Sequence, residues 1–352
     1  MDFIATADPD FANAALDELR RFDSGLHLRR TLGPGVLLVA TDQSERVFAT
    51  AVAAELPIFV RHLVPVHATL ALTNTQEDVD RLTRLVQDAR QIGRLEPGQA
   101  FSVQARFVSA EGPLPERPYS LFALKEAIVP VVERLTGARE NVKEPEMVIS
   151  LLLDEQTAYM GISSVSQNLS SWAGGMRRFA RDPEQISRSE FKLLEALDVF
   201  GLVLPRSGPA LDLGAAPGGW TRLLLAAGLE VTAVDPAELD VRVRDHPRLR
   251  HIRGRAQGFL DRARRRKERY RVILSDMRVD APEAARLMAQ AAPLLDPAGF
   301  ALVTLKLPYG APGVAPLEQL DQAIERLTRA YAEVRVRQLF HNRHEVTALL
   351  IP

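Results

Sequence analysis

The fold is decided by one stretch, Leu211-Asp212-Leu213-Gly214-Ala215-Ala216-Pro217-Gly218-Gly219-Trp220. An apolar segment runs into small residues, and a helix is predicted to begin near Trp220. Glycines let the backbone turn tightly and approach a ligand closely, because they carry no Cβ. In an open α/β sheet such a loop follows the first strand, at the edge where cofactors bind.

The surrounding sequence supports this sheet. Apolar segments predict strands near residues 210–213, 230–234, 271–275, 300–306, 333–340 and 346–351, and helical patterns fill most of the gaps. Strands that alternate with helices indicate an α/β fold with a doubly wound, mostly parallel sheet. The residues before position 166 also alternate strand and helix patterns, so the whole chain is predicted to be α/β.

The glycine loop does not match the common phosphate-binding patterns. A dinucleotide site needs Gly-x-Gly-x-x-Gly and a phosphate loop needs Gly-Lys-Ser/Thr, and neither is present. S-adenosylmethionine (SAM) has no phosphate and needs an acid for its ribose hydroxyls. Asp235 ends the next predicted strand, where a carboxylate would accept both hydroxyls. The alternative is a structural tight turn with an unrelated aspartate.

Four charged residues occupy unusual places near the ends of predicted elements. Asp276 and Lys306 end apolar strands, Glu345 begins a late strand, and Lys192 lies at the start of a helix. Each of them taken alone could belong to a solvated ion pair. Together they would bring two amines and two carboxylates to one edge of the sheet.

These motifs carry a resemblance. Ser187-Arg188-Ser189 with Lys192, the stretch Asp212 to Trp220, Ser275-Asp276-Met277, Leu305-Lys306-Leu307 and His344-Glu345 occur in the order found in FtsJ-type ribose 2′-O-methyltransferases. The resemblance covers about residues 187–352 and implies a Rossmann-like, SAM-dependent methyltransferase domain with a Lys-Asp-Lys-Glu tetrad. The tetrad would be Lys192, Asp276, Lys306 and Glu345. The residues implied to bind the cofactor are Ser187, Gly214, Ala216, Pro217, Gly218, Gly219, Trp220, Asp235, Gln257 and Asp276.

A ribose 2′-hydroxyl is a weak nucleophile, so its proton must be taken up as the methyl group is transferred. A neutral lysine can accept that proton if its pKa is lowered. We assign Lys306 as the base, Asp276 as its orienting partner, and Lys192 and Glu345 as supports on the substrate side. Gln257 departs from the family, which usually has an acid there for the adenine amino group. An amide carbonyl can still accept that hydrogen bond. Trp220 is also interpreted as a helix-packing residue.

Four segments are predicted. Residues 1–60 form a ferredoxin-like α/β domain, residues 61–165 resemble a THUMP RNA-binding domain, residues 166–183 form a linker, and residues 184–352 form the methyltransferase domain. The THUMP resemblance depends on Pro65, the alternating segment 101–107 and the strand pair near 147–162. The linker is rich in Ser and Gly and ends in arginines.

The composition limits the possible chemistry and partners. The chain has 352 residues, a net charge of −1 and no cysteine, which excludes disulfides, thiolate metal sites and a cysteine nucleophile. The histidines show no metal-ligand spacing, and no apolar run is long enough to cross a membrane. We expect a cytoplasmic protein without metal or membrane partner, monomeric or weakly dimeric.

The near-neutral charge hides one strongly basic segment. Residues 244–271 carry twelve Arg or Lys and three acids, a balance of +9. With Arg177, Arg178, Arg181 and Arg188, this segment is predicted to flank an RNA channel. The alternative is a solvated helix face.

The combined resemblance is to the bacterial large-subunit ribosomal RNA methyltransferase M family. It implies methylation of a cytidine ribose in 23S rRNA. The alternatives are the same chemistry on tRNA, and a non-catalytic RNA-binding or assembly protein. Methylation of cytosine C5 is disfavoured because it needs a cysteine. Amino-group methylation is disfavoured because Ser275-Asp276-Met277-Arg278 stands in place of an Asp/Asn-Pro-Pro-aromatic motif.

Overall fold

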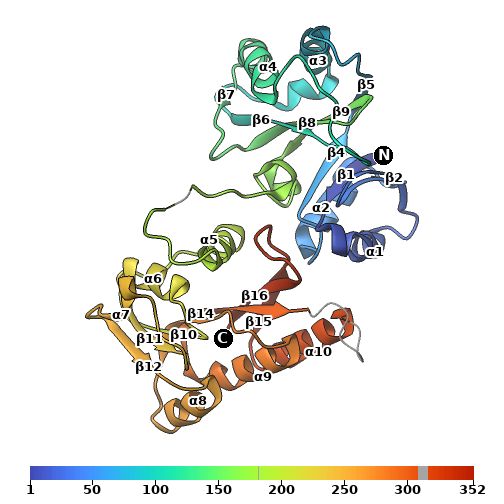
Figure 1. Cartoon of the computed structure of the whole chain (residues 1–352). Coiled ribbons are helices and arrows are strands. Elements are labelled where there is room, and N and C mark those ends of the chain that lie inside the picture. The colour runs from blue at the N-terminus through green and yellow to red at the C-terminus, as the bar shows by residue number, and fades with distance from the viewer. Residues whose placement is uncertain (181, 308–315) are drawn as a thin grey trace. The chain divides into compact units, whose positions relative to one another are not determined.

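The computed structural model describes residues 1–180, 182–307 and 316–352. The described chain divides into two compact units, Met1–Arg177 and Arg178–Pro352, which are described separately below. Each unit has its own sheets and its own helices, and both are α/β as predicted (Figure 1).

The N-terminal unit begins with a four-stranded sheet in the order β2-β3-β1-β4. Its strands are β1 (Asp2–Thr6), β2 (His27–Gly33), β3 (Val36–Ala40) and β4 (His62–Val66), and its helices are α1 (Ala12–Phe22) and α2 (Glu45–Glu55). All five residues of β3 are buried, whereas most of β2 is exposed. Strand β2 therefore lacks the continuous apolar residues of β3, which is why the sequence did not predict it.

The second sheet of this unit has five strands in the order β5-β9-β8-β6-β7. The strands are β5 (Ala68–Ala71), β6 (Ala100–Phe107), β7 (Arg139–Glu140), β8 (Met147–Leu153) and β9 (Thr157–Ser164), and the helices are α3 (Glu77–Gln87) and α4 (Leu121–Thr136). A small apolar core that includes Ile4, Val64, Leu152 and Tyr159 joins the two sheets.

Two contacts bear on the predicted domain limits. Strand β4 pairs with β1 in the first sheet, so sheet membership changes after Val66 rather than at residue 60. The segment predicted as a linker begins with residues held on the N-terminal unit, since the Asn168 carbonyl accepts from Leu63 N at 3.1 Å and the Gly174 carbonyl accepts from Thr6 Oγ1 at 2.8 Å. These bonds explain why the compact unit extends to Arg177.

The C-terminal unit is built on a seven-stranded sheet in the order β12-β11-β10-β13-β14-β16-β15. The strands are β10 (Pro209–Leu213), β11 (Glu230–Val234), β12 (Leu249–Ile252), β13 (Tyr270–Ser275), β14 (Leu295–Lys306), β15 (Glu333–Arg337) and β16 (Glu345–Ile351). The helices are α5 (Ser189–Val199), α6 (Gly219–Ala226), α7 (Val241–Arg244), α8 (Ala256–Arg265), α9 (Ala281–Ala291) and α10 (Pro316–Thr328). Among the described residues, none of these helices is both long and apolar enough to span a bilayer.

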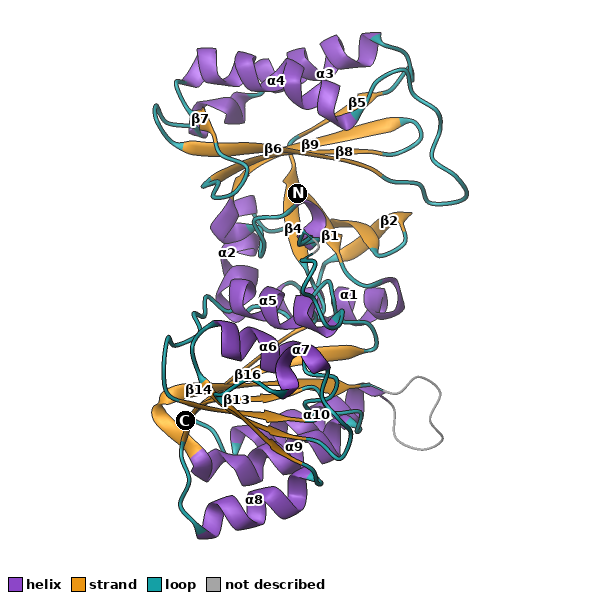
Figure 2. Ribbon diagram, turned by 60° about the vertical axis from the view of Figure 1, so that its left-hand side comes forward, coloured by secondary structure: helices purple, strands orange, loops and turns teal. Residues whose placement is uncertain are grey.

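The sheet is doubly wound, as predicted. Strands β10 to β14 run parallel, and β16 is antiparallel between β14 and β15. Helices α5 and α6 cover one face, and α8, α9 and α10 lie on the other (Figure 2). After β10 the chain adds β11 and β12 on one side of this strand and then β13 on its other side. At such a change of side, α/β proteins bind ligands in the crevice at the carboxyl ends of the strands.

Candidate active site

The glycine loop follows β10 at that edge. Gly214 has φ +76° and lies against Met277, and Gly218 has φ +112° at the start of α6. Both backbone conformations disfavour any residue with a Cβ. The Gly214 amide donates to the Val234 carbonyl at 2.9 Å. The loop therefore follows the first strand of the domain, as predicted, and is hydrogen-bonded to the end of β11.

Two aspartates support this loop. Asp212 is buried and accepts a hydrogen bond of 2.6 Å from Thr221 Oγ1. Burial, helped by the charges of Asp276 and Asp235 and opposed by the hydrogen bonds of Thr221, raises the pKa of Asp212 to about 7. Asp235 accepts from the backbone amides of Ala216 at 3.1 Å and Ala237 at 2.8 Å. Its carboxylate thus holds the end of the glycine loop, at the position expected for a ribose-binding acid.

Replacing Asp212 with asparagine should make the protein more stable at neutral pH. Between about pH 4 and pH 7 the folded protein keeps a proton on Asp212 that the unfolded chain has released, so the free energy of unfolding falls as pH rises. Asparagine keeps an oxygen that accepts the hydrogen bond from Thr221, and because it does not titrate it removes the loss of stability at higher pH. Relative to wild type, Asp212→Asn should gain about 2 to 3 kcal/mol between pH 5 and pH 8, measured by urea unfolding. An equal pH dependence in both proteins would contradict the buried, protonated aspartate.

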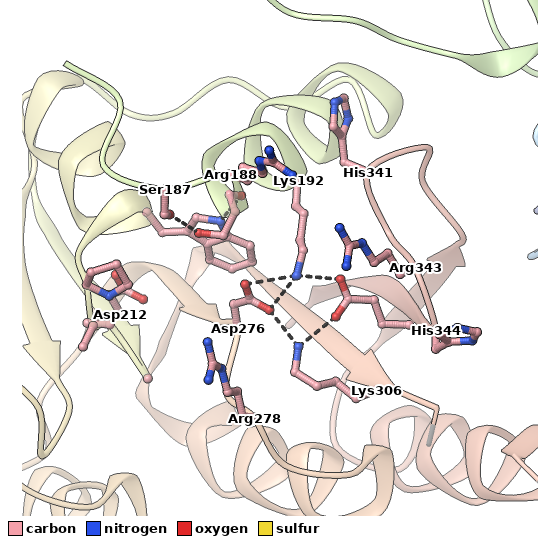
Figure 3. A pocket seen from close by; sticks show the side chains of 17 residues that line it. Ser187, Arg188, Lys192, Asp212, Asp276, Arg278, Lys306, His341, Arg343 and His344 are labelled. Carbon is pink, nitrogen blue, oxygen red and sulfur yellow. Dashed lines mark hydrogen bonds and ion pairs between the residues drawn. The ribbon is translucent and has the colours of Figure 1, made fainter. Parts of the chain in front are cut away.

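The four tetrad side chains meet in one hydrogen-bonded cluster, in which Figure 3 labels Lys192, Asp276 and Lys306. Lys192 Nζ lies 3.2 Å from Asp276 Oδ1 and 2.5 Å from Glu345 Oε1. Lys306 Nζ lies 3.2 Å from the same Asp276 oxygen and 2.8 Å from Glu345 Oε2. Each carboxylate therefore faces both amines. The side chains of Lys192 and Lys306 are 17% and 26% exposed, so the cluster is shielded but open to the pocket.

The protonation of Lys306 is set by opposing effects. Burial lowers the pKa of this lysine, but the charges and hydrogen bonds of Asp276 and Glu345 outweigh burial and leave the pKa raised. The pKa of Lys306 is thus raised, whereas a base that acts at neutral pH needs a lowered pKa. In the ligand-free protein Lys306 is an ammonium group paired with two carboxylates.

Residues that the sequence did not single out hold the tetrad in place. Thr304 Oγ1 donates to Asp276 Oδ1 at 2.6 Å. Buried Glu195 accepts from the amides of Phe340 and His341 at 2.8 and 2.9 Å and from His341 Nδ1 at 2.6 Å. Glu195 follows Lys192 by three residues on α5 and therefore shares its side of the helix. It ties the helix that carries Lys192 to the loop before Glu345.

The start of α5 is fixed in a similar way. Buried Glu190 accepts from the amides of Ile186 and Ser187 at 2.7 and 3.3 Å and from Arg222 Nε at 3.0 Å. Ser187 Oγ lies 2.6 Å from Ser189 Oγ. These bonds hold Ser187 at the pocket wall, where it was expected.

The tetrad and the glycine loop share one pocket of about 720 Å³. Its lining combines the loop, the start of α5, the tetrad and a basic set, and consists of Ser187, Arg188, Ser189, Lys192, Asp212, Gly214, Ala215, Ala216, Pro217, Trp220, Asp276, Arg278, Lys306, His341, Arg343, His344 and Glu345. Pockets of this size hold cofactors and drug-sized ligands. Three arginines in the wall, Arg188, Arg278 and Arg343, suit an anionic substrate (Figure 3).

Some of the predicted cofactor residues lie outside this lining. Among the described residues, Gly218, Gly219, Asp235 and Gln257 do not line the pocket. The Gln257 carbonyl accepts from Arg286 Nη1 at 2.7 Å, so it would have to release this bond to accept from an adenine amino group. Trp220 lines the pocket and is also buried, and its Nε1 donates to the Ser189 carbonyl at 2.7 Å.

The basic segment 244–271 does not form one surface beside the pocket. Helix α8 starts after β12, at the ligand-binding edge, and runs back toward the start of β13 at Tyr270. Arg262 to Arg269 therefore lie at the opposite edge of the sheet from Lys306. This half of the segment therefore does not flank the pocket that holds the tetrad, because the helix crosses the height of the sheet. Arg188 lines the pocket, and Arg181 lies outside the described residues.

Known proteins resemble this chain along most of its length. Residues 185–306 match the family model of FtsJ-like methyltransferases. The ribosomal RNA large subunit methyltransferase M of Halorhodospira halophila is 34% identical over 223 residues, which are 62% of this chain and 61% of that protein. The protein of the same name from Thauera aminoaromatica is 28% identical over 305 residues, 84% of this chain and 79% of its own length. Among solved structures, TrmN from Thermus thermophilus is 16% identical with a TM-score of 0.41 and full coverage of both chains.

Proposed function

This chain carries an FtsJ-like methyltransferase domain and is related to the ribosomal RNA large subunit methyltransferases M, and from this premise we propose its reaction. It transfers a methyl group from SAM to a ribose 2′-hydroxyl of a cytidine in 23S rRNA. The observation that carries the proposal is the Lys-Asp-Lys-Glu cluster at the wall of the pocket that the glycine loop also lines.

The residues around the glycine loop fit SAM. Gly214 lines the pocket with its backbone, and Asp212 and Ser187 add polar groups to the same wall. Asp235 lies beside Ala216 and would accept the ribose hydroxyls after giving up a backbone amide. When bound, SAM supplies a methyl group activated by a positively charged sulfur. The chain's own residues then have to position the hydroxyl and take up its proton.

In the proposed reaction, Lys306 Nζ accepts the proton of the ribose hydroxyl as the oxygen–carbon bond forms and the carbon–sulfur bond breaks. Lys306 must first lose its own proton, because the ligand-free cluster holds it as an ammonium group. Lys192 lies beside the same two carboxylates, so the negative charge that favours the ammonium form is shared between two amines. A further cation near Lys306 would lower its pKa. The hydrogen bonds to Asp276 and Glu345 hold the amine of Lys306 in one position and orientation.

Transfer of tritium from labelled SAM to isolated RNAs tests the function. We expect label in protein-free 23S rRNA and none above background in 16S rRNA or tRNA. Digestion to nucleosides should give 2′-O-methylcytidine. Because a 2′-O-methyl group blocks alkaline cleavage of the next phosphodiester bond, mapping of the resistant position identifies the nucleotide.

The other outcomes separate the alternatives. Label confined to tRNA would replace the ribosomal substrate while leaving the ribose chemistry in place. SAM binding without label in protein-free 23S rRNA, precursor ribosomal particles or tRNA would favour a non-catalytic RNA-binding protein. Label on a base rather than a ribose would contradict the assignment of the tetrad.

A further inference from the structure

The second half of the basic segment surrounds a separate concavity. This pocket of about 730 Å³ is lined by Asp261, Arg264, Arg265, Lys267, Arg269, Pro293 and Leu294. We call the concavity that these residues line the basal pocket. Among the residues that the structure describes, its lining holds four cations and one acid, and all four cations are exposed. The starts of β13 and β14, Tyr270 and Leu295, adjoin it in sequence, so it opens at the edge of the sheet opposite the tetrad.

Three of the four cations have no partner within the described part of the chain. Arg264, Arg265 and Lys267 make no side-chain hydrogen bond or ion pair there, whereas Arg269 donates to the carbonyls of Pro293 and Leu295. The nearby acids are engaged, since Asp261 accepts from Gln257 Nε2 at 3.2 Å and Glu268 accepts from the Tyr270 hydroxyl at 2.6 Å. The cations are therefore available to an external anion.

The backbone at Lys267 also argues that these cations do more than solvate the end of α8. Lys267 has φ +56°, the left-handed conformation in which glycine usually ends a helix. A residue with a Cβ, such as lysine, is disfavoured in this conformation. The partial negative charge at the end of α8 favours nearby cations. It acts on the last turn of the helix and does not explain why Lys267 and Arg269 continue the cluster beyond it.

We propose that the basal pocket binds the sugar–phosphate backbone of the RNA substrate at a stretch separate from the target nucleotide. None of the described residues that line it is aromatic, so it offers charge and guanidinium hydrogen bonds rather than base stacking. β13 spans about 20 Å between the two edges of the sheet, so the two contact places would lie several nucleotides apart along the RNA. The RNA would thus be held at two places, at the pocket with the tetrad and at the basal pocket.

This inference rests on the proposed RNA substrate, but its test does not need methylation. The variant carries Arg264→Glu, Arg265→Glu and Lys267→Glu. Its binding to protein-free 23S rRNA without SAM should weaken at least 10-fold at low salt. The slope of log affinity against log salt should fall by about 2, as expected when two to three phosphate contacts are lost. With 23S rRNA as methyl acceptor, KM should rise while kcat and SAM affinity stay within about 3-fold of wild type.

The matched control reverses three other arginines of the same unit, Arg326→Glu, Arg329→Glu and Arg335→Glu, and changes the net charge equally. Thermal unfolding of both variants checks that they fold. Unchanged affinity and salt slope in the basal-pocket variant would overturn the inference, and so would an equal loss in the control. A wild-type protein that binds rRNA but transfers no methyl group would remove the proposed function and leave the binding comparison intact.

Discussion

Replacing Lys306 with alanine is expected to reduce methyl transfer at least 1,000-fold, within the range that a positioned acid or base contributes. Lys306 Nζ lies 2.8 Å from Glu345 Oε2 and 3.2 Å from Asp276 Oδ1, at the pocket wall. Alanine removes the proton acceptor and leaves the glycine loop unchanged. SAM affinity, measured by calorimetry, should therefore stay close to wild type while single-turnover methylation is lost.

A second variant separates the role of a base from the role of a charge. Arginine at position 306 keeps the positive charge and its partners, but it cannot be deprotonated in a protein. Lys306→Arg should therefore be as inactive as the alanine variant if Lys306 takes the proton. Lys143→Ala, which removes an exposed lysine from the N-terminal unit, is the matched control and should keep full activity. An arginine variant within about 10-fold of wild type would show that charge alone is needed and would reject the base.

The sequence predicted the C-terminal sheet because its central strands have a strong apolar signal. Segments such as Val272-Ile273-Leu274 are buried on both faces, so they appear as continuous apolar runs. β12 was missed because Leu249-Arg250-His251-Ile252 is short, half polar and at the edge of the sheet. Propensity identifies strands of this edge type poorly, because pairing with a neighbour, here β11, decides their structure.

The tetrad could be predicted because each member follows or begins a recognisable motif, and the structure places all four within hydrogen-bonding distance. Its supports could not be found in the same way. Glu195 reaches the amides of Phe340 and His341, 145 and 146 residues away, and only the fold brings them together. The three-residue spacing from Lys192 to Glu195 was a usable signal, since it places two charged groups on one side of a helix.

The basic segment shows a different limit. A count of charges along the chain treats residues 244–271 as one block, but α8, which is about 15 Å long, separates Arg255 at its start from Arg265 at its end. Charge density in the sequence therefore indicated an affinity for anions without indicating which edge of the sheet carries it. The direction of the helix, fixed by the strand before it and the strand after it, decides that point.

Replacing Glu345 with glutamine is expected to lower the maximal rate by about 10- to 100-fold and to shift the pH dependence of the rate to lower pH. In wild type, the paired carboxylates raise the pKa of Lys306, so the fraction of free amine and hence the rate should rise with pH through the neutral and alkaline range. Glutamine removes one of the two negative charges that favour the ammonium form. Free amine then becomes available at lower pH.

The loss of maximal rate has a separate cause. The Glu345 carboxylate accepts from Lys192 through Oε1 at 2.5 Å and from Lys306 through Oε2 at 2.8 Å. A glutamine amide has one oxygen and one NH₂ group, so it can accept from one lysine but must turn a donor toward the other. One amine loses its fixed direction. Glu345→Asp, which keeps the charge but shortens the reach, should lose rate with a smaller shift in pH.

Rate against pH, measured under single-turnover conditions for wild type and both variants, separates these two effects. If the rising limb of Glu345→Gln coincides with that of wild type, the titrating group is not controlled by this carboxylate. Lys306 would then not be the group whose deprotonation limits the reaction, even if the alanine variant is inactive. The pH profile thus tests the proton acceptor itself, whereas the alanine variant shows only that the side chain is required.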